Sequence, residues 1–283
     1  MRRYFLIGLY ILFIGLMAGE GFARGLNART EALAGAGIGL IGSGQAIHYN
    51  PAGLAFMDGW EAHFTFVDRD YTQYIAGVAR NTGIGTFGLS AINYGYYSSD
   101  YTISSGYGVM ISDRFAVGAT LRLFHSGRFR ADDLNLDLGT YFVTGLRNTI
   151  VAAGMENVRR TGFGHVKLRA GLFFDLMSLL EPESLSHYLD LAVDVNDYIN
   201  DDRGSWANLG IEYQYRYLLS SYALEIALRG GVQSIYGIGV GDTTWGIGLK
   251  LETEGGRSIR VDYAPLTSMA YPDQHIVSIA FVF

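Results

Sequence analysis

The sequence predicts an all-β fold: a transmembrane antiparallel β-barrel of about 14 strands. Three observations predict it. Apolar and polar residues alternate with a period of two through most of the chain after residue 60. The composition combines 38 glycines, 20 tyrosines and 16 phenylalanines with only 4 prolines. No later segment approaches the length of an apolar membrane helix. A soluble β-sandwich is the alternative that alternation alone leaves open.

The first residues predict export from the cytoplasm. Arg2 and Arg3 precede an apolar run over residues 4–18, and Gly21 and Ala23 have the spacing that a signal peptidase accepts. The run is too short for a transmembrane helix, which needs about 20 apolar residues. We therefore expect residues 1–23 to be a cleaved signal peptide, with an uncleaved N-terminal anchor as the alternative.

Residues 24–59 do not alternate and are rich in glycine and alanine. Some of them, such as Ile47, Leu54 and Phe56, are too apolar for a solvated tail. Because a barrel of this width is not filled by its own side chains, we expect the segment to fold into the lumen as a plug, or hatch. A flexible periplasmic tail is the alternative.

Residues 60–283 are expected to form the barrel. The candidate strands are residues 60–68, 71–80, 83–95, 101–112, 114–125, 133–142, 146–154, 166–175, 187–196, 205–217, 221–231, 241–253, 257–264 and 274–283. The connections at one end are expected to be tight turns, except for an excursion at 176–186. Those at the other end, such as 126–132 and 265–273, are expected to be longer loops.

The same alternation predicts which charged residues face the lumen. In residues 188–195, for example, Leu189 and Leu191 alternate with Asp190 and Asp194. The expected lumen-facing set is Arg122, Arg169, Arg216, Arg229, Arg260, Asp190, Asp194, Glu212, Glu225 and Asp262, together with Lys167, Lys250 and Asp137. The mixed signs favour ion pairs that brace the wall and hold the plug. A polar permeation path is the alternative.

The end of the chain carries an apolar pattern of its own. Phe283, Phe281 and Ile279 lie on one face of the last candidate strand. A terminal aromatic residue preceded by apolar residues at every second position resembles the signal read by the outer-membrane barrel-assembly machinery. With the signal peptide, this predicts a bacterial outer-membrane protein whose partners include membrane lipid and that machinery.

A short motif lies in the segment before the barrel. Residues 32–37 read ALAGAG, and after a spacer His48 precedes Tyr49-Asn50-Pro51-Ala52-Gly53. This combination resembles the start of the FadL-like outer-membrane proteins, especially their PorV/PorQ branch, and the resemblance covers nearly all of the chain after residue 23. It implies a barrel of fourteen strands with an N-terminal hatch inside.

The resemblance implies two different functions. PorV and PorQ serve type IX secretion, whereas the FadL branch takes up hydrophobic compounds through a lateral gap in the wall. Because the lumen is expected to be charged, we favour a plugged secretion scaffold whose partners include secretion-system subunits or exported cargo. Uptake of hydrophobic small molecules is the alternative, with an exit at the glycine-rich third strand, which contains Gly83, Gly85, Gly88 and Gly95.

Other chemistries are disfavoured, and we expect no catalytic residues, metal site or cofactor. The chain has no cysteine, its six histidines are scattered and it contains no GxSxG motif. Gly37, Gly39 and Gly42 match GxGxxG, but they lack the strand–turn–helix setting of a dinucleotide site. The net charge of −6 gives no reason to expect nucleic acid as a partner. We expect His48 to be a hydrogen-bonded plug residue.

Overall fold

The computed structural model describes residues 26–68, 72–95, 100–127, 131–146, 149–159, 166–177, 186–199, 205–235, 239–268 and 271–283. The predicted signal peptide, residues 1–23, lies outside the described residues. Among the residues that are described, no helix is long and apolar enough to cross a membrane.

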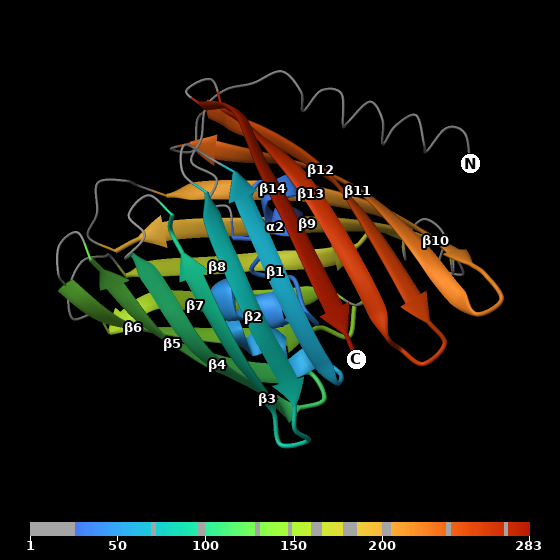
Figure 1. Ribbon diagram of the computed structural model, residues 1–283, viewed down its shortest axis with the longest axis horizontal. Helices are drawn as coiled ribbons and strands as arrows, with labels where there is room; N and C mark the ends of the chain where they lie inside the picture. Colours follow the sequence, from blue (N-terminus) through green and yellow to red (C-terminus); the bar gives the residue numbers. More distant parts are fainter. Residues whose placement is uncertain are drawn as a thin grey trace.

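Within the described residues, fourteen antiparallel strands form one closed barrel (Figure 1). Each strand pairs with its neighbours in sequence, and the first pairs with the last to close the wall. The predicted barrel is therefore confirmed. The strands are β1 (Trp60–Asp68), β2 (Gln73–Asn81), β3 (Thr86–Asn93), β4 (Tyr101–Ser112), β5 (Phe115–Ser126), β6 (Ala131–Val143), β7 (Ile150–Arg159), β8 (Lys167–Asp175), β9 (His187–Tyr198), β10 (Trp206–Leu218), β11 (Tyr222–Ile235), β12 (Gly239–Thr253), β13 (Ser258–Ser268) and β14 (Tyr271–Val282).

Some strand ends differ from the prediction. The strand expected at 146–154 runs from Ile150 to Arg159, and the loop expected at 265–273 is mostly strand. There Pro265, the first residue of the expected loop, lies in the ladder opposite His275. The predicted difference in loop length between the two ends is therefore wrong, because β11, β13 and β14 continue into the expected loops.

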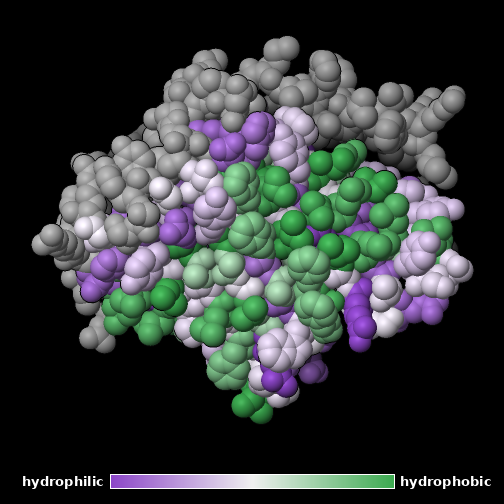
Figure 2. Space-filling model, viewed as in Figure 1, coloured by the Kyte–Doolittle hydropathy of each residue, from purple (hydrophilic) through white to green (hydrophobic). Residues whose placement is uncertain are grey.

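The outer face of the barrel is apolar. On β5, Leu121 and Leu123 are 48% and 41% exposed, whereas Thr120, which faces the inside of the barrel, is fully buried. Figure 2 shows apolar side chains gathered over the outer surface of the wall. A water-soluble sandwich would bury this face between two sheets, so the arrangement suits a barrel surrounded by lipid.

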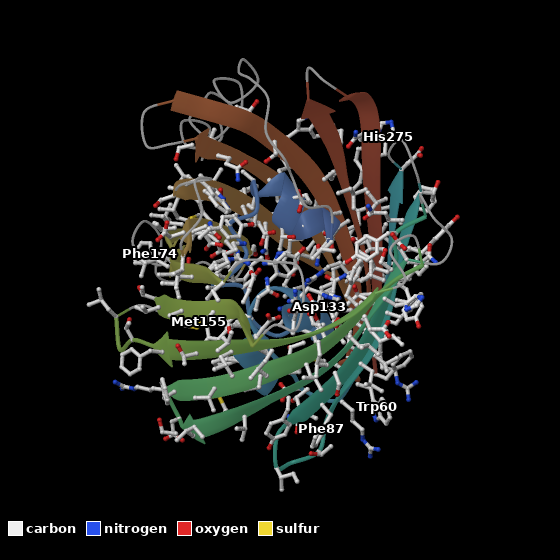
Figure 3. The ribbon with its side chains drawn as sticks, turned by 90° about the vertical axis from the view of Figure 1, so that its left-hand side faces the viewer. Trp60, Phe87, Asp133, Met155, Phe174 and His275 are labelled. Atoms are coloured by element: carbon white, nitrogen blue, oxygen red, sulfur yellow. The ribbon has the colours of Figure 1, made fainter. Side chains whose placement is uncertain are left out.

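Exposed aromatic side chains lie near the strand ends. Figure 3 shows Trp60 and Phe87 near one end of the barrel and His275 near the other. The guanidinium of Arg80 lies 4.5 Å from the centre of the Trp60 ring. Aromatic and cationic side chains at this height are typical of the boundary between lipid and water.

Residues 26–59, which we call the inner segment, lie inside the barrel (Figures 1 and 3). This segment contains three short helices: α2 (Ala28–Ala32), η2 (Gly44–His48) and η3 (Pro51–Phe56). The first packs against β11–β14, the second against β1–β4 and the third against β3–β6. They contribute to the buried apolar clusters, with Ala52 in one and Ile47 and Leu54 in another, where they pack against side chains of the wall.

Each of the three helices begins at a side chain that caps it. Asn27, Ser43 and Asn50 accept hydrogen bonds from the backbone N–H groups two residues later. Such caps satisfy donors that a helix start leaves free. Pro51 follows Asn50 at the first helical position, where it removes no hydrogen bond. The Asn-Pro pair of the sequence motif is thus a helix start.

Candidate functional site

Glycines of the wall allow the inner segment to approach closely. Gly108, Gly118 and Gly139 lie directly opposite one another on β4, β5 and β6. A Cβ at each of these positions would overlap η3 or its cap, including the side chain of Asn50 beside Gly139. The wall is therefore shaped for this segment at the position of the sequence motif.

The side chains of Asn50 and Tyr141 join the inner segment to the barrel wall. Asn50 Nδ2 donates to the carbonyl oxygens of Thr140 and Ala153, at 3.2 and 3.4 Å. The buried Tyr141 hydroxyl lies 2.7 Å from the carbonyl oxygen of Leu40 and also contacts that of Ile38. Asn50 therefore caps η3 and docks it on the wall, and Ala52 and Gly53 of η3 are buried.

Asp194 of β9 binds the backbone of the inner segment. Its Oδ2 accepts hydrogen bonds from the N–H groups of Gly37 and Ile38, both at 3.0 Å. The same oxygen lies 2.7 Å from the guanidinium of Arg169, which also pairs with Glu156. A buried carboxylate is stable when it is paired and hydrogen-bonded in this way.

A second ionic network anchors α2. Arg29 binds Glu212 through two hydrogen bonds of 3.0 and 2.6 Å. Glu212 also pairs with Arg229, which donates to Asp262 at 2.7 Å. Three residues of the predicted lumen-facing set thus meet in one buried cluster with a partner from the inner segment.

The rest of the predicted charged set is spread along the inner wall. Arg122 pairs with Asp137 at 2.6 Å and donates to the carbonyl oxygen of His48 at 3.1 Å. The remaining members lie in rows across neighbouring strands: Asp190 between Asp175 and Glu212, Glu225 opposite Arg216 and Lys250, Lys250 opposite Arg260, and Lys167 opposite Glu156. Arg216 and Lys250 also pair with Glu252.

His48 is buried inside the barrel. Its Nε2 lies 2.9 Å from the hydroxyl of Ser90. Burial, together with the nearby Arg122 guanidinium and His63, holds the pKa of the His48 imidazole well below its usual value of 6.5. The ring is therefore neutral at physiological pH. Among the described residues, no group of three or more His, Cys, Asp or Glu side chains could hold a metal ion.

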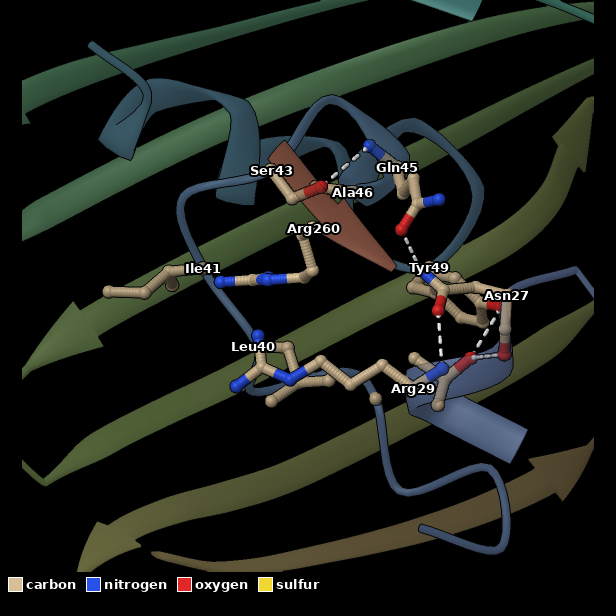
Figure 4. Close-up of a pocket in the computed structure, with 11 residues that line it drawn as sticks. Asn27, Arg29, Leu40, Ile41, Ser43, Gln45, Ala46, Tyr49 and Arg260 are labelled. Atoms are coloured by element: carbon tan, nitrogen blue, oxygen red, sulfur yellow. Dashed lines mark hydrogen bonds between the residues drawn. The ribbon is translucent and has the colours of Figure 1, made fainter. Parts of the chain in front are cut away.

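Two cavities lie between the inner segment and the wall. The larger, of ≈ 120 Å³, is lined by residues of β5 and β7–β12 and by Tyr49. A smaller one of ≈ 30 Å³ is lined by Arg29, Arg260 and again Tyr49 (Figure 4). The Tyr49 hydroxyl accepts a hydrogen bond of 2.6 Å from Thr30. Tyr49 is thus a lining residue of both cavities.

The wall is irregular at β6 and β7. Leu136 pairs with Arg159 and Leu138 with Met155, so Asp137 alone opposes residues 156–158. Asn157 has a φ of 58°, and its N–H donates to the Asp137 carboxylate at 2.9 Å. This is a β-bulge in which a side chain replaces a ladder acceptor.

The third strand has no such break. Gly88 pairs in register with Ala79 on one side and Gly106 on the other. Gly83 and Gly85 lie in the β2–β3 turn with positive φ, and Gly95 follows the strand. The expected exit at the third strand is therefore wrong, because Gly88 is paired on both sides and the other three glycines lie in the connections that flank β3.

The predicted assembly residues lie on β14 and just after it. Phe281 is opposite Ala62 of β1, and Ile279 is opposite Phe64. Phe283 is 64% exposed, and its N–H donates to the carbonyl oxygen of Trp60 at 2.9 Å. These residues therefore form the seam that closes the barrel.

Several residues of the site were not singled out from the sequence. Arg29, Tyr141, Asn196 and Trp206 contribute contacts or cavity lining. Asn196 and Trp206 stand on the inner face of strands that were predicted, so their alternation could have indicated them. Arg29 and the contacts of Tyr141 depend on the path of the inner segment, for which the sequence has no periodic signal.

Solved structures share this architecture. The sequence matches no family model and no curated protein. The toluene transporter TodX of Pseudomonas putida aligns over 94% of this chain and 99% of its own, with a TM-score of 0.59 and 9% identity. The CymD monoaromatic hydrocarbon channel aligns over 92% and 98%, with a TM-score of 0.56 and 10% identity.

A FadL homologue from Pseudomonas aeruginosa aligns over 94% of this chain and 99% of its own, with a TM-score of 0.55 and 9% identity. The structural neighbours are thus FadL-family outer-membrane channels. They are transport proteins rather than enzymes. These likenesses concern the fold, and they lend no support to the narrower resemblance to PorV and PorQ.

Proposed function

We propose that this protein is an outer-membrane channel for the uptake of small, mainly hydrophobic organic molecules. The observation that carries the proposal is the fold shared over almost the whole chain with channels described as transporters of toluene and monoaromatic hydrocarbons. The apolar outer face suits membrane lipid, which would be its first partner. The barrel-assembly machinery would be its second.

The inner segment acts in this proposal as the plug of the channel. Its helices contact β1–β6 and β11–β14, and among the described residues it borders the two cavities. A substrate would bind in the larger cavity and leave through a gap that opens in the wall or past Tyr49. We place the wall exit at the β6–β7 bulge, because Glu156 of this bulge lines the larger cavity.

The secretion scaffold is the less supported of the two functions expected from the sequence. Its case depended on the PorV/PorQ resemblance and on the excursion at 176–186. Residues 178–185 of that excursion lie outside the described residues. No contact within the described residues favours a secretion partner over a small molecule.

The test is uptake by a deletion strain of the native host and by the same strain carrying the gene. Initial accumulation of radiolabelled toluene, benzyl alcohol and benzoate should fall in the deletion strain and return on complementation. Uptake of a sugar that uses general porins is the control and should not change. Equal accumulation of all three aromatics in both strains would contradict the proposal. Loss of surface proteins with normal uptake would instead favour the scaffold.

A further inference from the structure

The larger cavity has a polar row on its inner wall. Arg169, Asn196 and Trp206 lie directly opposite one another on β8, β9 and β10, and all three line the cavity. Directly opposed residues of neighbouring strands have Cβ atoms about 4.5–5.5 Å apart, so these side chains form one continuous surface. The row lies toward the end of the barrel where β10 begins.

Two members of this row carry hydrogen-bond donors without a partner among the described residues. They are Nε of Arg169 and Nδ2 of Asn196, and Nε of Arg122, also in the lining, is a third. The Arg169 side chain is 5% exposed and Asn196 is 1% exposed. A buried donor without an acceptor costs about 1–3 kcal/mol. A bound molecule with acceptor atoms beside these donors would remove that cost.

Other atoms of both guanidinium groups are already engaged, namely Nη1 and Nη2 of Arg169 and Nη2 of Arg122. Arg169 binds Asp194, Glu156 and the carbonyl oxygen of Gly35. Arg122 binds Asp137 and the carbonyl oxygen of His48. These contacts fix the orientation of both guanidinium groups. Their Nε donors therefore cannot turn toward another protein atom.

Aromatic surface completes the cavity. Trp206 packs against Tyr198 with ring centres 5.1 Å apart, and Lys167 lies 5.4 Å from the centre of the Trp206 ring. Tyr49 of the inner segment lies in the lining as well. A flat ring can pack on such faces. An apolar cavity of about 150 Å³ is known to bind benzene, so a cavity of this size suits a single ring.

We infer that the larger cavity binds a monoaromatic molecule that carries an oxygen hydrogen-bond acceptor, and that it discriminates against plain hydrocarbons. The inference rests on the proposed function and narrows its substrate class. A hydrocarbon of the same size would displace water from Arg169 and Asn196 and replace none of its hydrogen bonds. An oxygenated ring supplies the acceptor and fills the same volume.

The binding test uses the tryptophans of the chain, of which there are three. Trp60 and Trp245 face outward, at 45% and 39% exposure, so the variant W60F/W245F leaves Trp206 as the only indole. Fluorescence of this purified variant in detergent is titrated with benzamide, benzoate and toluene. At least one oxygenated probe should bind about tenfold more tightly than toluene, which corresponds to about 1.4 kcal/mol. Toluene binding as tight as both oxygenated probes, or no binding by any probe, overturns the inference.

A matched pair of substitutions locates the donor. Asn196→Leu keeps the side-chain size and removes the amide, so it should weaken binding of the oxygenated probe about fivefold or more and leave toluene unchanged or tighter. Asn135→Leu on the inner face of β6 is the control, because Asn135 is opposite Arg122 but does not line the cavity. Heat-modifiable migration verifies that both variants fold. Equal loss in both variants, or no loss in Asn196→Leu, contradicts the assignment.

The two proposals fail separately. The titration uses purified protein and reports on the cavity, whereas the deletion strain reports on transport. Selective binding without any uptake phenotype would contradict the proposed channel function and support the proposed binding site. Normal uptake of all three aromatics with no preference in the titration would support the proposed channel function and contradict the proposed binding site.

Discussion

Gly139 of β6 leaves the space that the side chain of Asn50 occupies. An ideal Cβ built on Gly139 would overlap the Asn50 amide, which docks on the carbonyl oxygens of Thr140 and Ala153. The contact joins the sequence motif of the inner segment to a glycine more than eighty residues away. It makes the position of the inner segment depend on the absence of one methyl group in the wall.

The first prediction concerns this contact. Gly139→Ala should displace Asn50 and η3, because overpacking a closely packed site costs about 1–3 kcal/mol. The free energy of unfolding in a urea series should fall by that amount, and a protease should cut the inner segment faster. Gly88→Ala is the matched control, since Gly88 also faces inward but the nearest atom to its added Cβ is at 3.5 Å. Equal behaviour of the two variants would mean that η3 adapts to the wall.

The second prediction concerns the anchor at Asp194. Asp194→Ala removes the acceptor for Gly37 and Ile38 and leaves Arg169 with one ionic partner fewer. Removing one member of a buried ion pair costs about 3–5 kcal/mol. The free energy of unfolding measured with urea should fall by this amount. Asp58 is an exposed carboxylate of the same segment, so Asp58→Ala should leave the free energy of unfolding nearly unchanged. A loss under about 1 kcal/mol would mean that water replaces the carboxylate.

Sequence periodicity predicted the wall well because each strand has one apolar face on the outside of the barrel and one face on the inside. The bounds of β1 and β4 agree with the structure to the residue. The side of the barrel at which Asp194 or Glu212 points also follows from alternation. Their partners do not, because Gly37 and Arg29 belong to a segment whose path is set by packing. The β7 bulge was missed for a similar reason, since two extra residues leave the alternation intact.

The third prediction concerns pH. Since the folded-state pKa of His48 lies below its usual value of 6.5, the folded protein binds fewer protons than the unfolded chain below pH 6.5. Stability should therefore be full above pH 6.5 and fall as the pH drops below it. His48→Gln keeps a donor for Ser90 and cannot charge, so its unfolding free energy should fall less over the same range.

Unfolding midpoints measured between pH 7.5 and 5 give the comparison. His125→Asn is the control, because His125 is part-exposed at the end of β5 and pairs with Asp132 rather than with Ser90 or another partner of His48. Parallel pH curves for wild type and His48→Gln would show that His48 takes up no proton on unfolding, or that other groups dominate.

The last prediction decides the route by which a substrate leaves the barrel. Residues 156–158 oppose Asp137 alone, so deletion of Asn157 and Val158 should restore a regular ladder between β6 and β7. Because two residues are removed, the rest of β7 keeps its inward and outward faces. If the wall opens at this bulge, uptake of toluene, benzyl alcohol and benzoate by the two-residue deletion variant should drop to the level of the strain that lacks the gene. The amount of heat-modifiable barrel should stay unchanged. Asn157→Gly, which tolerates the positive φ of 58° and keeps the bulge, should transport like wild type. Wild-type uptake by the two-residue deletion would exclude the bulge as the exit and direct attention to Tyr49, which borders both cavities.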